Sequence, residues 1–169
     1  MNPKPEATTV SVSKACTLAV DAVRAWALIR DFNAMPRWNG SVLESRIEAG
    51  PADRVGCRRV LLFDDGGVWT HLLTGLSDVD MKLQYSIVAT PQPMRIPVWN
   101  YRAEILVLPL AAAPAANQAC SIEWRAQFET AHADEMKRRA SQVFEAGFAG
   151  LRRCLETGAA PGAAAPPGD

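Results

Sequence analysis

Three charged or titratable side chains of this 169-residue chain stand in strand-like segments that are otherwise mostly apolar. His71 lies in the segment VWTHLLTGL, and an imidazole facing the interior would be a general base or a hydrogen-bond partner near neutral pH. Arg59 and Glu44 form a charge pair if both face inward, because buried charges need each other or a polar ligand. His71, Glu44 and Arg59 are therefore our candidate catalytic residues. The alternatives are a solvent-exposed His71, and mutual neutralisation of Arg59 and Glu44 at a rim.

Tyr85 and Tyr101 place phenolic hydroxyls at the ends of apolar side chains, which suits them to orient a ligand or to donate a proton. Core packing with each hydroxyl bonded to the backbone is the alternative. The sequence holds no Ser-His-Asp arrangement, phosphate loop or dinucleotide fingerprint. The four cysteines lie far apart, with no C-x-x-C pair and no histidine at ligand spacing, so we expect neither a metal nor a cofactor. One base in a shaped apolar cavity would still be enough for a cyclase or dehydratase.

The charge balance narrows the class of partner. Eighteen basic residues balance eighteen acidic ones, and no dense Lys/Arg run is interleaved with aromatic residues, which argues against nucleic acid. The segment MNPKPEATTV lacks the apolar core of a secretory signal, and no stretch approaches the ~18 consecutive apolar residues of a membrane span. We therefore expect a cytoplasmic protein without membrane insertion.

A long amphipathic helix and a series of strands must position these candidates. Within residues 134 to 156, apolar residues recur every three or four positions, which predicts a helix with one buried face. Seven strand-like segments precede it, and two short helical segments follow the first strand, the second limited to about one turn by Pro36. The predicted fold is α+β, a curved antiparallel sheet of about seven strands wrapped around the C-terminal helix. Gly147 and Gly150 in this helix indicate either space for a ligand or close packing.

The composition divides the chain into one domain and two ends. Residues 10 to 156 form the predicted ligand-binding domain, whereas residues 1 to 9 and the Ala/Pro/Gly-rich tail 157 to 169 hold too little apolar surface to become ordered. Three prolines in residues 90 to 99 predict a stiff loop at the cavity entrance, and the Ala-rich residues 111 to 119 predict a surface loop.

Period-two alternation predicts which strand residues face the interior. It turns Tyr85 and Tyr101 inward and, by parity with the neighbouring apolar residues, Arg59 as well. In residues 67 to 76 the alternation leaves two registers open. One register faces Trp69, His71 and Leu73 inward, and the other faces the intervening residues inward.

Several segments occur in the order found in a known superfamily: VRAWALIRDFNAMPRW, VGCRR, LLTGLSD, YSIV, NYRAEI and the tryptophan of SIEWRAQF. This pattern resembles the SRPBCC superfamily, the helix-grip fold shared by START lipid-transfer domains, the birch pollen allergen, polyketide cyclase/dehydrase-like proteins and plant abscisic-acid receptors. The resemblance implies an interior cavity for a small apolar ligand and favours the register with His71 inward. The expected wall residues are Glu44, Arg59, Leu61, Phe63, Trp69, His71, Leu73, Tyr85, Ile87, Tyr101, Ala103, Val143, Phe144 and Gly147.

The chain differs from the abscisic-acid receptors at the positions that bind the hormone there. Glu44 stands where the receptors have a pocket lysine, His71 where they have a pocket glutamate, and the short FDDGG turn replaces their gate loop. Among the branches of the superfamily, the chain therefore resembles the polyketide cyclase/dehydrase-like one. This resemblance implies binding of a lipid-like, aromatic or polyketide-like molecule. The alternatives are a cyclase/dehydratase-type enzyme with a cavity acid or base, and a stress or protein-interaction factor with a vestigial cavity; the oligomeric state stays open.

Overall fold

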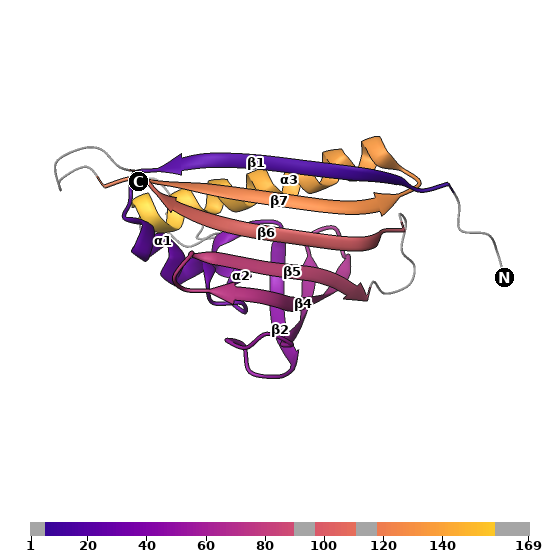
Figure 1. Cartoon of the computed structure of the whole chain (residues 1–169), viewed down its shortest axis with the longest axis horizontal. Coiled ribbons are helices and arrows are strands. Elements are labelled where there is room, and N and C mark those ends of the chain that lie inside the picture. Colours follow the sequence, from indigo (N-terminus) through magenta and orange to yellow (C-terminus); the bar gives the residue numbers. More distant parts are fainter. Residues whose placement is uncertain (1–5, 90–96, 111–117, 158–169) are drawn as a thin grey trace, which may run out of the picture.

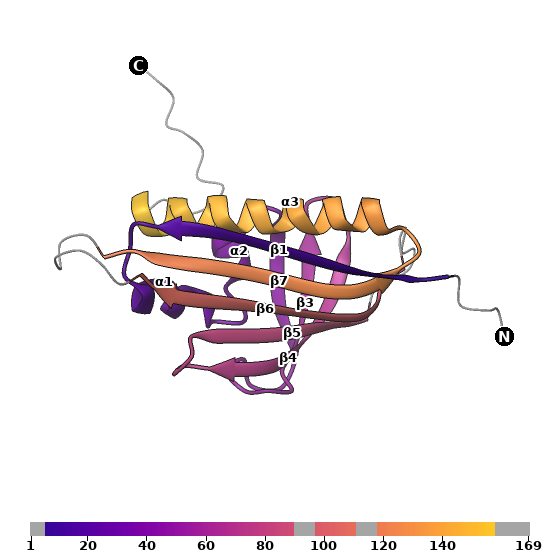
Figure 2. The same ribbon diagram turned by 45° about the horizontal axis from the view of Figure 1, so that its top comes forward.

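The computed structural model describes residues 6–89, 97–110 and 118–157. In this part of the chain, seven strands form one antiparallel sheet in the order β1-β7-β6-β5-β4-β3-β2. The strands are β1 (Thr8–Leu18), β2 (Val42–Ala49), β3 (Arg58–Phe63), β4 (Val68–Ser77), β5 (Lys82–Ala89), β6 (Trp99–Pro109) and β7 (Cys120–Thr130). Helix α3 (Ala133–Arg152) lies along β1 and β7, while β2 and β3 run steeply across that direction (Figures 1 and 2). The predicted helix-grip fold is confirmed.

Helix α3 buries the face that the sequence predicts and then ends in a π-helical turn, Arg153–Thr157. The buried residues are Met136, Ala140, Phe144, Gly147, Phe148, Gly150, Leu151 and Leu155. The two glycines allow close packing. A Cβ on Gly150 would lie 1.7 Å from the carbonyl oxygen of Trp38, and a Cβ on Gly147 would lie 2.7 Å from the Trp124 ring. Of the two readings of these glycines, close packing is therefore the one that the structure shows.

Two short helices link β1 to β2, as predicted. Helix α1 (Ala22–Ile29) begins at Asp21, whose side chain accepts hydrogen bonds from the backbone N–H groups of Val23 and Arg24. Helix α2 (Met35–Trp38) has Pro36 in its first turn and extends for only four residues. Trp38 is buried beside Trp124, with ring centroids 5.8 Å apart, so α2 is fastened to both the sheet and α3.

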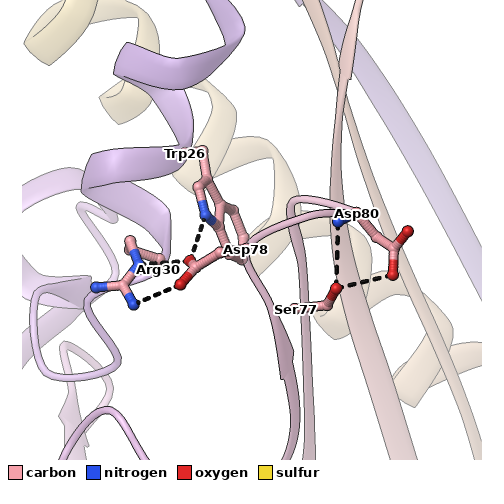
Figure 3. Close-up of polar contacts among 5 residues, drawn as sticks. All are labelled: Trp26, Arg30, Ser77, Asp78 and Asp80. Carbon is pink, nitrogen blue, oxygen red and sulfur yellow. Dashed lines mark hydrogen bonds and ion pairs between the residues drawn. The ribbon is translucent and has the colours of Figure 1, made fainter.

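An exposed carboxylate fastens α1 to the turn between β4 and β5 (Figure 3). Asp78 accepts hydrogen bonds from Trp26 Nε1 at 2.8 Å and from Arg30 Nε at 2.7 Å. These bonds lower the pKa of the Asp78 carboxyl, with the Arg30 bond as the larger cause. Ser77 and Asp80 close the same turn through a 2.8 Å bond between the Ser77 hydroxyl and an Asp80 carboxylate oxygen. We call the hydrogen-bonded group of Trp26, Arg30 and Asp78 the clasp. It holds the end of α1 in place, and with it the loop that leads to Met35.

The strand registers decide which side chains reach the interior. Arg59 pairs with His71, and Leu61 with Trp69, so the register with His71 inward is confirmed. A bulge in β2 has the opposite effect on Glu44. Val42 pairs with Phe63 but Glu44 pairs with Leu62, which inserts one extra residue and turns Glu44 to the outer face, where it is exposed. The prediction that Glu44 faces inward is wrong, because alternation alone does not register a bulge.

Some predictions fall outside the described residues: the disorder of 1–5 and 158–169, and the loops at 90–96 and 111–117. Two element boundaries differ from the prediction: β1 begins at Thr8, inside the segment 1 to 9 that was expected to be disordered, and β6 begins at Trp99, the last residue of the predicted loop 90 to 99. No helix within the described ranges is long and apolar enough to cross a membrane.

Candidate functional site

A small cavity of about 60 Å³ lies between the inner face of the sheet and the first half of α3. Its lining combines strands β3 to β6 with α3 and with Met35 at the start of α2. The lining residues are Met35, Phe63, Trp69, His71, Tyr85, Ile87, Tyr101, Met136, Arg139, Ala140, Val143 and Phe144. These residues include no carboxylate and no thiol, and their polar nitrogen and oxygen atoms belong to one imidazole, two phenols, one guanidinium and the Trp69 indole.

His71 lies at the sheet end of this cavity and is only 3% exposed. Its ring stacks on Tyr85, with centroids 4.7 Å apart and planes inclined by 15°. Its Nδ1 lies 3.3 Å from a terminal nitrogen of Arg59. Burial, and then the positive charge of Arg59, hold the pKa of His71 well below its usual 6.5. The imidazole is therefore neutral at physiological pH.

Arg59 lies directly behind His71 and does not itself line the cavity. Its guanidinium donates to the backbone carbonyl of Phe32 and to the Met35 sulfur at 3.4 Å, and it lies 3.9 Å from the centroid of the Phe32 ring. The Nε atom is buried without a partner. Among the described residues Arg59 forms no ion pair, and burial lowers its pKa from 12.5 to about 10. Within the described residues, the site thus holds a buried cation that no carboxylate contacts.

Two phenols continue the aromatic wall away from His71. The Tyr85 hydroxyl accepts a 3.1 Å hydrogen bond from Trp124 Nε1, and Tyr101 stacks on Phe128 with centroids 5.4 Å apart. Burial raises the pKa of both Tyr85 and Tyr101, so both keep their protons at physiological pH. These residues shape the cavity and supply hydroxyl groups, but they do not supply a base.

The other side of the cavity is bordered by a contact between α3 and the β3–β4 turn. Arg139 pairs with Asp65 and lies 5.9 Å from the ring centroid of Trp69. Trp69 and Arg139 are both partly exposed, so this contact lies where the cavity approaches solvent. The turn itself follows the predicted Asp-Asp-Gly-Gly sequence, with Gly66 at φ +81°.

Eight of the predicted wall residues line the cavity and six do not. Arg59, Leu61, Leu73 and Ala103 are buried around it, Gly147 packs against tryptophans, and Glu44 lies outside. The predicted Arg59–Glu44 pair is accordingly wrong. Four lining residues were not predicted from the sequence: Met35, Met136, Arg139 and Ala140. Helical spacing from Val143 and Phe144 contained the signal for three of them, since residues three and four apart share a face.

A family model described as polyketide cyclase / dehydrase and lipid transport matches residues 9–156. The chain belongs to this family. None of the functionally curated proteins matches it.

Solved structures of other proteins share the fold of this family member. The protein XoxI from Bacillus cereus has a TM-score of 0.72 at 21% identity, covering 87% of this chain and 96% of its own. A START superfamily protein from Mycobacterium smegmatis has a TM-score of 0.70 at 17% identity, covering 88% and 99%. A protein from Thermobifida fusca has a TM-score of 0.67 at 24% identity, covering 85% and 91%. At these identities the likeness shows the fold alone.

Within the described ranges, no group of three or more His, Cys, Asp or Glu side chains is arranged to hold a metal ion.

Proposed function

We propose that this protein binds a small, mostly apolar molecule, such as a lipid-like, aromatic or polyketide-like compound, in the cavity between the sheet and α3. The observation that carries this proposal is the composition of the cavity wall, in which apolar and aromatic side chains surround a few polar atoms. The family match and the helix-grip fold support the same class of ligand, because they imply a hydrophobic ligand-binding cavity.

The size of the cavity sets a condition on this proposal. Its volume of about 60 Å³ holds only a few water molecules, whereas ligand pockets commonly occupy about 300–1,000 Å³. A ligand must therefore displace side chains. Met35 and Met136 both line the cavity, and methionine adapts to irregular contents more readily than other apolar residues. Val143 and Trp69 are only partly buried, so they have room to move.

The contacts at the cavity favour binding over catalysis by a base. Glu44, one of the candidate bases, lies on the outer face of β2. His71 reaches the cavity, but its Nδ1 faces Arg59 and its pKa is held well below 6.5. The cavity therefore lacks the Glu44 carboxylate, and His71 is a weaker base than a free imidazole, which disfavours a proton-abstracting cyclase or dehydratase.

Native mass spectrometry of the purified protein tests the proposal, followed by release and identification of any bound compound. We expect a bound apolar molecule, or saturable uptake of acetophenone as a small aromatic probe, that Val143→Phe abolishes by filling the cavity. Ala149→Phe is the matched control, because it adds the same ring to an exposed position of α3. Uptake that is equal in both variants, or absent from the wild-type protein, would contradict the proposal.

A further inference from the structure

The polar end of the cavity is His71, backed by the buried Arg59, and the geometry of this pair determines which atom meets a ligand. A guanidinium carries only donors, so the Arg59 nitrogen 3.3 Å from His71 Nδ1 must donate to it. A neutral imidazole has one donor nitrogen and one acceptor nitrogen. Because Nδ1 accepts, Nε2 carries the proton. The contact with Arg59 therefore selects one tautomer of the ring.

No described residue accepts a hydrogen bond from the Nε2–H group, and this group is the part of the ring that the cavity reaches. Within the described part of the chain, Trp38 Nε1 and Arg59 Nε are the only occluded side-chain nitrogen or oxygen atoms that lack a hydrogen bond. His71 Nε2 is not among these occluded atoms, yet no described residue bonds it. Since His71 lines the cavity and its Nδ1 side faces Arg59, Nε2 is reached from the cavity. A ligand acceptor placed there would complete the hydrogen bonding of the ring.

The electrostatics of this end favour a negative partner. The Arg59 charge is not matched by a carboxylate in an ion pair, and Asp31, the carboxylate that acts on it at longer range, is exposed and accepts a 3.0 Å bond from the Asn33 backbone. Arg139, which does line the cavity, is paired with Asp65. An unbalanced buried cation polarises the Arg59–His71 dyad so that Nε2–H becomes a stronger donor.

We infer that His71 recognises a carbonyl oxygen of the ligand by donating a hydrogen bond to it from Nε2–H. Arg59 is the positioning residue that stabilises this tautomer of the ring. The inference rests on the proposed binding function and adds its specificity. A ketone and a carboxylic acid share the required acceptor, and the buried charge of Arg59 draws either oxygen to the same end of the cavity. The rest of the ligand lies against the apolar wall.

The tautomer can be measured without any ligand. The chain has two histidines, so long-range ¹H–¹⁵N spectra of the wild-type protein at pH 7, with His132→Gln for assignment, resolve the His71 ring. We expect a neutral ring protonated on Nε2, and a mixture of tautomers in Arg59→Met, in which Nδ1 no longer faces a donor. A proton on Nδ1 in the wild-type protein, or a charged ring at pH 7, would overturn the inference.

A matched pair of probes tests recognition of the carbonyl oxygen. Acetophenone and α-methylstyrene have nearly the same shape, but a methylene group replaces the oxygen in the second. We expect acetophenone to bind about 3- to 10-fold more tightly, the range for one net hydrogen bond, and the preference to disappear in His71→Phe, which keeps the stacked ring. Benzoate distinguishes an acid from a ketone as the preferred form of the ligand.

The outcomes separate the two proposals. Equal affinity for the two probes, or a preference that persists in His71→Phe, overturns the role of His71 and leaves the binding function standing. If neither probe binds, the proposed function fails and the inference fails with it. Should His71→Phe not fold, the ratio of affinities and the ring spectra of the wild-type protein still decide the question.

Discussion

Replacing Arg59 by methionine should make the protein more stable, although it removes a buried side chain with several contacts. Burial lowers the pKa of Arg59 from 12.5 to about 10, which corresponds to about 3 kcal/mol of unfavourable free energy for the charged form at neutral pH. Methionine has a similar length, carries no charge and packs beside Met35, which already contacts the guanidinium. Burying an apolar side chain in place of an unpaired ion often stabilises a fold.

The gain is smaller than the whole charge penalty, because the substitution also removes hydrogen bonds. The Phe32 carbonyl loses its donor, and an orphaned buried acceptor costs about 1–2 kcal/mol. We therefore expect the free energy of unfolding to rise by about 1–2 kcal/mol, and Tm to rise by about 2–8 °C for a chain of this length.

Urea unfolding at pH 7.5, with thermal unfolding as a second measure, tests this expectation. Arg59→Lys is the matched control, because it keeps the charge and loses the planar contact with Phe32, and it should be less stable than the wild-type protein. Destabilisation of Arg59→Met by more than about 1 kcal/mol would refute the reasoning. It would mean that the contacts of Arg59 outweigh its burial and that the residue serves the fold and not the ligand.

Three further predictions concern other parts of the molecule. The pKa of His71 is depressed in the folded state, so the unfolded chain takes up the proton first, and stability should fall as the pH drops below about 6.5. Urea titrations of His71→Phe should lack this component, and an unchanged pH profile in that variant would disprove it. Gly150→Ala should cost more than about 3 kcal/mol, because the added Cβ meets the Trp38 carbonyl at 1.7 Å, whereas Gly40→Ala meets only Arg153 at 3.7 Å and should be nearly neutral in chemical unfolding. Asp78→Asn should speed hydrogen exchange of the α1 amides, because it weakens the bonds to Trp26 and Arg30. Asp80→Asn is the control, and equal exchange rates in the two variants would show that Asp78 does not hold α1 in place.

Alternation and helical spacing predicted most of the fold for a physical reason. A buried face needs apolar residues at every second position of a strand, or every third and fourth position of a helix, so the inner rows around Tyr85, Tyr101 and Phe144 are visible in the sequence. The short α2 follows from Pro36 and the tight β3–β4 turn from Asp65-Gly66, because both effects act within a few residues.

The candidate site was less predictable, because its decisive contacts join distant segments. Arg59 was expected beside Glu44, but one extra residue in β2 turns that carboxylate outward, and Arg59 meets the Phe32 carbonyl and His71 instead. Nothing in the local pattern of β2 distinguishes a bulge from continuous alternation. The neutral state of His71 likewise depends on its burial beside a cation that is 12 residues away in the chain.

The sequence by itself determined the α+β class, the order of the elements and the buried face of the C-terminal helix, since these depend on residue type and spacing along the chain. Only the tertiary structure decided how much space remains between the sheet and α3, and which polar atom is presented there. Both are set by packing between segments: Trp38 against Gly150 draws the helix close, and Arg59 against His71 fixes the donor. The cavity volume and the tautomer are therefore properties of the assembled core.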